Sequence, residues 1–301
     1  MRSLLFTGAS GFVGSNILSF LNSKYIVDTL GISDSSTYCV DLIKKIPIFG
    51  KKYDIILHAA GKAHSIPKSA RERQSFYDVN YLGTKNLCTG LERNGLPCSF
   101  IFISTVAVYG CESGEYITED HPLNAKTPYG RSKIQAEKFL SEWCGRNDVF
   151  LTILRPSLLA GKNPTGNLAT MINGIATGKY VGIANGDARK SIAMAEDIGR
   201  LIPYCENKSG IFNLCDDHHP SFKELEEFIS KQLHKSLPIR VPMCFAKCLA
   251  KFGDLFGFAT INTHKLSKMT QPLTFSNERI KKTLNFVPTN VLKNYSICLN
   301  W

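Results

Sequence analysis

Three glycines spaced three residues apart directly follow the first apolar run of the chain, and they restrict its fold more than any other feature. Residues 4–8 (LLFTG) are short, apolar and end in glycine, as a buried parallel strand does, and residues 15–21 continue with helical spacing. Such glycines let the backbone turn tightly and approach a pyrophosphate, which the free N–H groups of the next helix attract. The pattern predicts a dinucleotide-binding turn formed by Gly8, Ser10, Gly11, Phe12, Val13 and Gly14.

Strand and helix patterns then alternate through the first half of the chain. This alternation predicts an α/β fold of the Rossmann type, in which a doubly wound parallel sheet is covered by helices on both faces. We expect strands at residues 4–8, 25–32, 54–60, 99–110 and 149–156, and helices at residues 15–21, 77–93 and 129–143.

The pattern loosens after residue 160, where asparagine, glycine and proline cluster. We therefore predict a dinucleotide-binding domain over residues 1–160 and a smaller substrate-binding domain over residues 161–301, with some segments returning to the first sheet. Residues 221–234 are typical of an amphipathic helix. Residues 241–261 are apolar with charges at intervals, which favours a core-packed helix, while a membrane-surface helix and a dimer contact remain open.

Composition excludes several classes of protein. The 301 residues are 44% hydrophobic and 20% charged, as in an ordinary globular protein, and no apolar run reaches about eighteen residues, so we expect no membrane span and no secretion signal. The net charge of +11 is spread along the chain, which indicates an anionic small molecule and no nucleic acid as partner. The ten cysteines lack metal-binding spacing, so we expect reduced thiols, no metal site and a cytoplasmic location.

The sequence gives only a weak preference between NAD and NADP as the cofactor. Asp34 lies twenty residues after Gly14, the spacing of a ribose-binding carboxylate, but the strand before it ends near residue 31, too early to present Asp34 well. No arginine lies between residues 2 and 71, so a clamp for a 2′-phosphate is missing. We therefore favour NAD slightly over NADP, with Asp41 and Leu42 as candidate contacts to the adenine.

A phenol and an ammonium stand four residues apart at Tyr129 and Lys133, and on a helix they share one face. A nearby cation and an oxidised nicotinamide would stabilise the phenolate, so that Tyr129 can exchange a proton at neutral pH. Ser104 and Thr105 follow a buried strand, where such folds bind ligands, and either hydroxyl can bond a substrate oxygen.

Together these motifs resemble the extended short-chain dehydrogenase/reductase family, most closely its sugar-nucleotide epimerase branch. The resemblance covers nearly the whole chain and is carried by TGASGFVG, DIILHAAG, NYLGT, STVAVYG, YGRSK and LRPS. It implies that Thr105, Tyr129 and Lys133 are catalytic, with Tyr129 transferring the proton and Lys133 binding the ribose. The further cofactor contacts that it implies are His58, Ala59, Ala60, Gly61, Asn80, Ser104 and Pro156, with Asn80 in the family's structural position.

The same resemblance assigns a substrate site. Asn167 matches a contact to the sugar-nucleotide phosphates, and Arg189 and Lys190 stand where a basic residue usually holds the diphosphate. Lys190 occupies a position that is often arginine, although Arg189 can substitute for it. His64 is a candidate contact to a sugar or cofactor oxygen. The resemblance also implies a homodimer, formed through the helices that contain residues 81–91 and 129–140.

Three activities remain open at this stage. Resembling 4,6-dehydratases carry an Asp-Glu pair directly after the catalytic threonine, and here Val106 and Ala107 stand there, so dehydration is disfavoured. We rank a 4-epimerase of a UDP-hexose or UDP-N-acetylhexosamine slightly ahead of a reductase of a UDP-4-keto-6-deoxy-amino sugar for surface polysaccharide. A non-catalytic dinucleotide sensor is the third hypothesis, and it is disfavoured because Thr105, Tyr129 and Lys133 are all retained.

Overall fold

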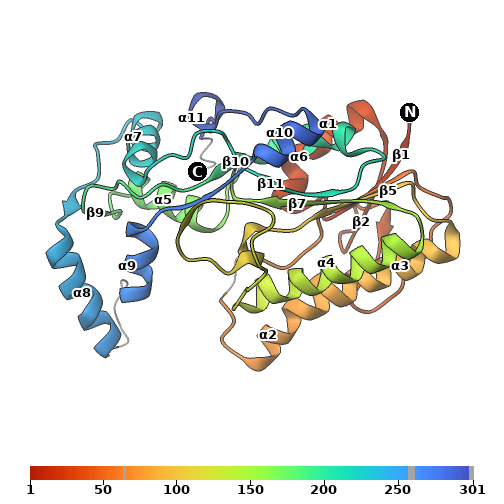
Figure 1. Ribbon diagram of the computed structural model, residues 1–301, viewed down its shortest axis with the longest axis horizontal. Helices are drawn as coiled ribbons and strands as arrows, with labels where there is room; N and C mark the ends of the chain where they lie inside the picture. Colours follow the sequence, from red (N-terminus) through yellow and green to blue (C-terminus); the bar gives the residue numbers. More distant parts are fainter. Residues whose placement is uncertain (64–65, 257–261, 298–301) are drawn as a thin grey trace.

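The computed structural model describes residues 1–63, 66–256 and 262–297, and a parallel sheet of seven strands forms its centre (Figure 1). Every neighbouring pair in this sheet is parallel. In spatial order the strands are β11 (Gly210–Leu214), β7 (Phe150–Pro156), β5 (Ser99–Ile103), β4 (Ile55–His58), β1 (Ser3–Thr7), β2 (Ile26–Gly31) and β3 (Tyr38–Cys39). The chain starts in the middle of the sheet and changes direction beside β1, which confirms the predicted doubly wound fold.

Alternate side chains of the central strands point to opposite faces, and each face is covered by its own helices. Leu4 and Phe6 belong to one buried cluster, whereas Leu5 between them belongs to the other. The helices on the first face are α1 (Phe12–Lys24), α6 (Ala195–Cys205) and α10 (Glu278–Leu284), and those on the second are α3 (Gly83–Asn94) and α4 (Pro128–Arg146). Complete burial of each such leucine or phenylalanine contributes roughly 1.5–3 kcal/mol, so both faces stabilise the sheet.

Two segments differ from the sequence-based expectation. The helix expected at 77–93 is a longer unit, in which α2 (Ala70–Tyr77) continues through the π-helical turn η1 (Asp78–Leu82) into α3. The strand expected at 99–110 was wrong in its second half, because β5 ends at Ile103 and residues Val106–Tyr109 form the 3₁₀ turn η2. The Thr105 side chain caps that turn and Gly110 closes it at a φ of 70°, so the β-branched residues here leave the sheet.

Three short strand pairs lie outside the main sheet in the described part of the chain, and the second half of the chain adds further helices around them. The pairs are β8 (Leu158–Ala160) with β10 (Ile192–Met194), β9 (Gly182–Ile183) with β12 (Arg240–Val241), and β6 (Gly114–Ile117) with β13 (Leu273–Phe275). The helices are α5 (Gly166–Ala176), α7 (Phe222–Gln232), α8 (Met243–Phe256), α9 (Thr263–Thr270) and α11 (Val291–Asn294). Helices α6 and α10 and strand β11 pack on or join the main sheet, while a domain boundary at residue 160 stays a prediction.

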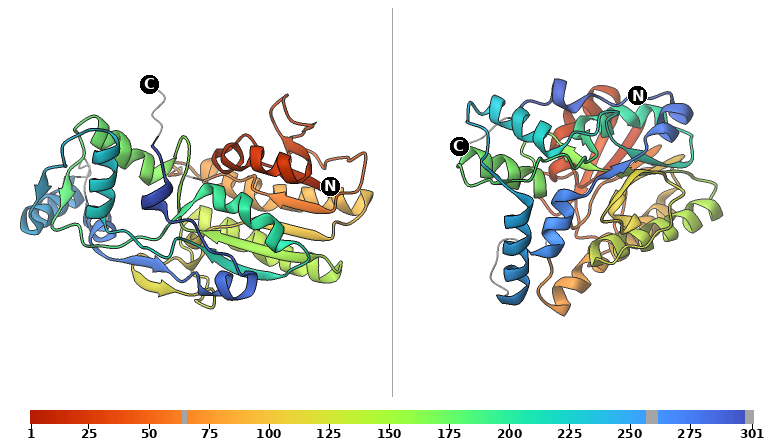
Figure 2. Two further views of the ribbon diagram at one scale, coloured as in Figure 1. Left: turned by 90° about the horizontal axis from the view of Figure 1, so that it is seen from above. Right: turned by 60° about the vertical axis from the view of Figure 1, so that its left-hand side comes forward.

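Helices α8 and α9 lie side by side at one end of the molecule and project away from the sheet (Figures 1 and 2). The buried residues of α8, Ala246 and Ala250, pack with Leu266 of α9 and Ile183 of β9. Among the side chains of α8 that the structure describes, Phe245 and Leu249 are exposed, which is less burial than a core helix would have. Among the described residues, no helix has both the length and the apolarity that a bilayer crossing requires.

Candidate active site

The glycine turn adopts a shape that larger residues would disrupt. Gly8 has a φ of +80°, and a Cβ there would lie 2.6 Å from the backbone nitrogen of Ala60. A Cβ on Gly14 would lie 2.2 Å from the carbonyl oxygen of Ala9. Helix α1 starts after Gly11 with no side chain capping its N–H groups and no acidic residue in its first turn. These free donors and the positive helix end fit the pyrophosphate of a dinucleotide.

We predict that Gly14→Ala lowers the affinity for NAD at least about tenfold, because separating the new Cβ from the Ala9 carbonyl displaces the phosphate-binding turn. Isothermal titration calorimetry with NAD measures the effect. Gly145→Ala is the matched control, since a Cβ at that helical position meets no atom within 4 Å. Equal affinities of the two variants would contradict the prediction.

The loop after β4 is held against the glycine turn by buried polar contacts. The Thr7 hydroxyl accepts a hydrogen bond from the Ala60 N–H (3.2 Å) and contacts His58 Nδ1 (2.6 Å), and His58 Nε2 contacts the Thr84 hydroxyl (2.9 Å). Burial and the nearby Lys133 ammonium lower the pKa of His58 to about 3, so the imidazole is neutral. The buried side chain of His58 therefore holds the loop after β4 in place through its contacts with Thr7 and Thr84. The backbone of Ala59 and Ala60 in this loop lies against the glycine turn.

Asn80, which the resemblance assigns a structural role, connects the loop after β4 to helix α4. Its side chain accepts from the Lys62 N–H (2.7 Å), and it donates to the Lys62 carbonyl (3.1 Å) and to the Ser132 hydroxyl (2.9 Å). A Cβ on Gly61 would lie 3.0 Å from Asn80 Oδ1 and 3.2 Å from Lys133 Nζ. The loop after β4 is thus brought into contact with the start of α4.

Helix α4 starts where its sequence favours a start, and this places Tyr129 in the first turn. The Thr127 hydroxyl accepts from the Gly130 N–H (3.2 Å), and Pro128 occupies the first helical position. The phenol of Tyr129 is hydrogen-bonded by Thr105, whose oxygen also accepts from the Ala107 N–H (3.1 Å). Burial raises the pKa of Tyr129 and the Thr105 hydrogen bond opposes that rise. The predicted pair of Thr105 and Tyr129 is therefore brought together.

Lys133 lies one helical turn further on and is 4% exposed. Its ammonium donates to the Ile103 carbonyl (2.8 Å) and lies 4.5 Å from the centre of the Phe102 ring. Burial lowers the pKa of Lys133 to about 8, while Glu137 opposes the shift. The Ile103 carbonyl and the Phe102 ring thus hold the ammonium of Lys133 at the edge of the sheet. A cofactor bound at this edge would meet a buried cation that is already in position.

A buried ion pair beneath these residues was missed by the sequence analysis. Arg155 and Glu137 form two contacts, Nη2 to Oε2 (2.6 Å) and Nε to Oε1 (3.1 Å), with side chains 2% and 4% exposed. Glu137 also accepts from the Ser104 hydroxyl, and Arg155 donates to the Tyr109 hydroxyl (3.1 Å). Ser104 is therefore turned into this network and away from Tyr129. The sequence signal that could have indicated a buried charge network is the spacing of Lys133 and Glu137, which places both on one face of the helix.

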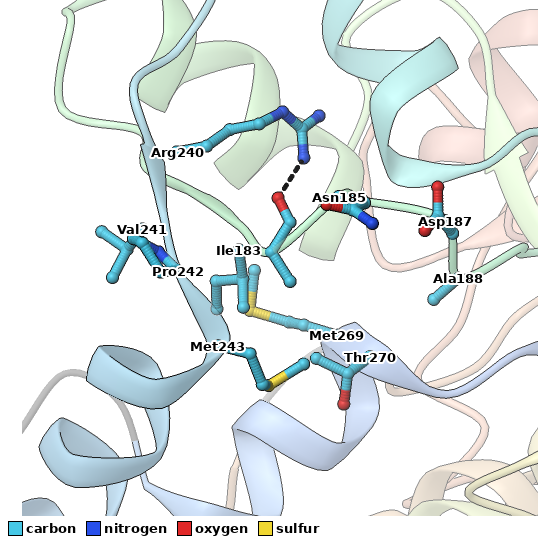
Figure 3. Close-up of a pocket in the computed structure, with 12 residues that line it drawn as sticks. Ile183, Asn185, Asp187, Ala188, Arg240, Val241, Pro242, Met243, Met269 and Thr270 are labelled. Carbon is cyan, nitrogen blue, oxygen red and sulfur yellow. Dashed lines mark hydrogen bonds between the residues drawn. The ribbon is translucent and has the colours of Figure 1, made fainter.

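A cavity of about 660 Å³ opens between β9, β12, the start of α8 and the end of α9 (Figure 3), and none of Thr105, Tyr129 and Lys133 lines it. Arg240 donates to the Ala184 carbonyl (3.1 Å) at its rim and is paired with Glu226. The lining residues are Ile183, Ala184, Asn185, Gly186, Asp187, Ala188, Arg240, Val241, Pro242, Met243, Met269 and Thr270. The cavity combines apolar walls with the Arg240 guanidinium and the Asp187 carboxylate, the mixture of apolar and polar lining that is usual for small-molecule sites.

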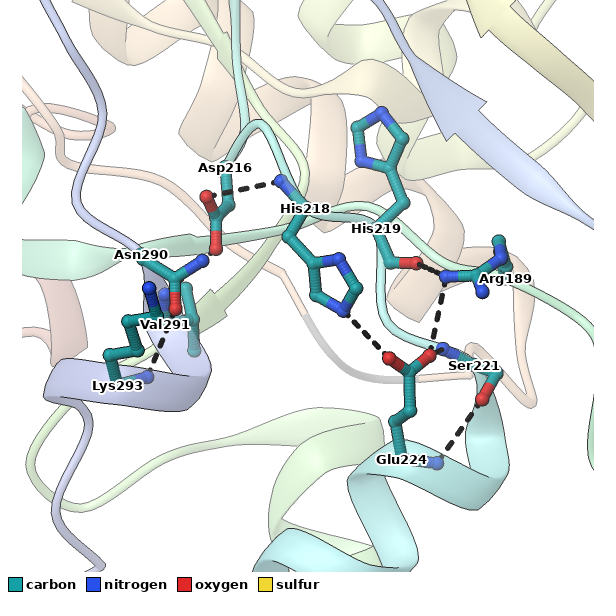
Figure 4. Close-up of polar contacts among 9 residues, drawn as sticks. All are labelled: Arg189, Asp216, His218, His219, Ser221, Glu224, Asn290, Val291 and Lys293. Atoms are coloured by element: carbon teal, nitrogen blue, oxygen red, sulfur yellow. Dashed lines mark hydrogen bonds and ion pairs between the residues drawn. The ribbon is translucent and has the colours of Figure 1, made fainter.

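Arg189 and Lys190, which are predicted to bind the diphosphate, directly follow the cavity-lining residue Ala188 in the chain. The Arg189 guanidinium donates to the His219 carbonyl (2.7 Å) and to Glu224 (3.2 Å), as Figure 4 shows. The Lys190 ammonium donates to the Gln271 carbonyl (2.9 Å), and burial, with Lys268 nearby, lowers its pKa to about 8. Arg189 already has a carboxylate partner, so Lys190 is the better placed of the two for an anion.

The remaining predicted residues are dispersed. Asn167 is exposed in the first turn of α5, and Pro156 is buried at the end of β7. Leu42 is buried in the core, while the Asp41 carboxylate accepts from the Ile43 N–H (3.0 Å). His64 lies outside the described residues.

Comparison with known proteins identifies a family. A model described as the NAD dependent epimerase/dehydratase family matches residues 4–215. The chain is 30% identical over 290 residues to an N-acetyl-alpha-D-glucosaminyl-diphospho-ditrans,octacis-undecaprenol 4-epimerase of Escherichia coli O157:H7, covering 89% of this chain and 86% of the relative. It is 27% identical over 314 residues to a UDP-glucose 4-epimerase of Vibrio cholerae, covering 97% and 92%. The fold also matches a structure of RMD from Pseudomonas aeruginosa complexed with NADPH, with a TM-score of 0.75, 20% identity and coverage of 98% and 96%.

Proposed function

The chain belongs to the NAD-dependent epimerase/dehydratase family, and we propose that it is a 4-epimerase of a sugar joined through a diphosphate to a carrier group. The observation that carries the proposal is the grouping of Thr105, Tyr129 and Lys133 at the carboxyl edge of the sheet, in contact with the loop that meets the glycine turn. Val106 and Ala107 supply no acid or base, so dehydration is disfavoured.

Each residue of this group has a distinct task. Tyr129 takes the proton from the sugar C4 hydroxyl and returns it, while Thr105 holds the phenol oxygen and bonds the same substrate oxygen. Lys133 keeps a positive charge beside the phenolate and the cofactor ribose. A bound nicotinamide supplies the acceptor and donor of the hydride at C4. NAD is the cofactor we favour, as before, and the relative that holds NADPH keeps NADP open.

The substrate in this proposal extends from Tyr129 toward the cavity at Arg240. Asn167, Arg189 and Lys190 would contact the diphosphate, and the carrier group would occupy the cavity. A UDP-linked hexose or N-acetylhexosamine is the substrate class we favour. The name of the E. coli relative specifies a different carrier, an undecaprenol, on the same kind of diphosphate.

Purified protein incubated with UDP-glucose, UDP-N-acetylglucosamine and a UDP-4-keto sugar tests the proposal. Conversion of a 4-hydroxy sugar without net consumption of cofactor supports the epimerase. Stoichiometric oxidation of NADH or NADPH with the keto sugar supports the reductase instead, and a Pseudomonas aeruginosa relative named GDP-6-deoxy-D-mannose reductase keeps this as the second candidate. Tight cofactor binding without any turnover would indicate the sensor.

We predict that NAD affinity falls above about pH 8, by up to about tenfold per pH unit, as Lys133 loses its proton. The sign follows from the charge: the ammonium form of Lys133 binds the cofactor ribose more strongly than the neutral amine, so NAD affinity falls as the proton is released with rising pH. His58 stays neutral over this range. Calorimetry between pH 7 and 9.5 measures the profile, and a Lys133→Met variant should bind weakly with little pH dependence. An affinity of the native protein that is constant with pH would contradict the assignment.

Homodimerisation through α3 and α4 is part of the proposal and has a separate test. Light scattering of the purified protein should give twice the 33.4 kDa mass of one chain. A monomeric mass at micromolar concentration would remove this part of the proposal without affecting the chemistry.

A further inference from the structure

Asn16 of helix α1 joins the glycine turn to a segment that lies far along the chain. Its amide oxygen accepts from the Lys162 N–H (2.7 Å), and its amide nitrogen donates to the carbonyls of Lys162 (3.1 Å) and Phe12 (2.8 Å). Phe12 is the first residue of α1 and belongs to the turn that we predict to bind the pyrophosphate. One side-chain amide therefore holds both the start of α1 and the backbone of Lys162.

A glycine allows the two segments to approach this closely. Gly161 is buried, and a Cβ there would lie 2.7 Å from Asn16 Oδ1 and 3.0 Å from the Cβ of Ala195, the first residue of α6. The chain therefore passes between α1 and α6 at a point where only glycine fits without a shift. A larger residue at position 161 would push the Asn16 amide away from Lys162.

The segment that Asn16 holds is connected to two residues that we propose as contacts to the substrate diphosphate. Residues 161–165 join β8 to α5, and Asn167 lies in the first turn of α5. Strand β8, which ends directly before this segment, pairs with β10, and Lys190 stands two residues before β10. The Asn16 contact therefore lies between the start of α1 and the part of the chain that carries Asn167 and Lys190.

We propose that Asn16 is a positioning residue that couples the cofactor site to the substrate site, so that a bound cofactor raises the affinity for the substrate diphosphate. This inference rests on the proposed function, which places a diphosphate at Asn167 and Lys190. Asn16 acts through the backbone of Lys162 and contacts neither ligand. Because such a coupling is reciprocal, the substrate raises the affinity for the cofactor by the same factor.

Conformational entropy explains how one amide can link the two sites. Residues 161–165 belong to no helix or strand, so holding them in one conformation for the substrate costs entropy. The Asn16 amide restrains this segment at both the N–H and the carbonyl of Lys162. A pyrophosphate bound at the start of α1 restrains Phe12 and, through it, Asn16. Part of the ordering cost is then met before the substrate binds.

Calorimetric titration of UDP into the full chain, with and without saturating NAD, tests the coupling. UDP carries a diphosphate but no sugar that could react. In the native protein, NAD should raise the affinity for UDP at least about fivefold, the lower end of the usual range for coupled sites. In Asn16→Ala this factor should fall below about twofold. The NAD affinity of the variant without UDP should stay within about threefold of the native value, since the phosphate-binding glycines are unchanged.

Gln232→Ala is the matched control for this titration. The Gln232 amide, at the end of α7, likewise accepts from one backbone N–H, that of Ile297 (2.8 Å), and donates to one backbone carbonyl, that of Tyr295 (2.7 Å). The control should keep the native coupling factor. Gly161→Ala disturbs the proposed contact from its other side and should lose the coupling as Asn16→Ala does, because its Cβ displaces the Asn16 amide.

Hydrogen exchange followed by mass spectrometry adds a measurement that needs no substrate. NAD should slow exchange at residues 8–14 in both proteins, but at residues 161–168 only in the native protein and not in Asn16→Ala. A native coupling factor in Asn16→Ala, or an equal loss of coupling in Gln232→Ala, overturns the inference. Epimerisation of a UDP sugar with either result leaves the proposed function standing. Slowed exchange at 161–168 without any binding of UDP or a UDP sugar removes the proposed function, and the coupling with it.

Discussion

Replacing Tyr129 by phenylalanine lowers epimerase turnover at least about a hundredfold, because the variant lacks the group that exchanges the proton with the sugar hydroxyl. The substitution removes one oxygen atom and leaves the ring that packs beside Phe76, with a distance of 6.3 Å between ring centres. The backbone of α4 and the position of Lys133 should therefore be unchanged. Initial rates of UDP-sugar epimerisation at saturating substrate measure the loss.

Two observations separate this effect from a disturbed fold. Tyr116→Phe removes the same oxygen from a phenol that is 64% exposed, and it should retain full activity. NAD affinity of Tyr129→Phe should stay within about threefold of the native value, because the phosphate-binding turn is untouched. Turnover near the native rate in Tyr129→Phe would end the mechanism proposed here.

Replacing Arg155 by methionine destabilises the protein by about 3–5 kcal/mol, because it leaves the Glu137 carboxylate buried without its counter-charge. Both side chains are almost fully excluded from water, and the guanidinium also donates to the Tyr109 hydroxyl. The carboxylate accepts from Ser104, so its displacement should also disturb the adjacent Thr105. Urea denaturation at 25 °C followed by circular dichroism measures the change.

A double-mutant cycle shows whether the loss belongs to the ion pair. Removing both charges with Glu137→Leu/Arg155→Met should cost less than the sum of the single variants, since no unpaired charge then remains buried. Lys282→Met is the surface control. Its side chain is 77% exposed and pairs with the exposed Glu278, so the loss should stay below about 1 kcal/mol. A strictly additive double variant would contradict a coupled pair.

Local patterns predicted the main sheet because the physical causes are themselves local. Alternating burial follows from the period of a strand, as Leu4, Leu5 and Phe6 illustrate by pointing to opposite faces. The position of Gly14 reflects a contact with Ala9 within the turn, whereas that of Gly8 also reflects the close approach of Ala60 in the loop after β4. Tyr129 and Lys133 share a face through helix geometry alone. The same reasoning overextended β5, because β-branched residues at 105–108 favour strands wherever the chain places them.

The remaining features depend on contacts between distant segments, which no local pattern contains. Sequence alone predicted the glycine turn, the order of strands and helices, and the group of Thr105, Tyr129 and Lys133 that we propose as catalytic. Tertiary structure decided that Ser104 turns inward to Glu137, that His58 is buried and neutral, and that Arg155 closes the network. It also decided which face of α8 stays uncovered, because burial depends on whether another segment folds against that face.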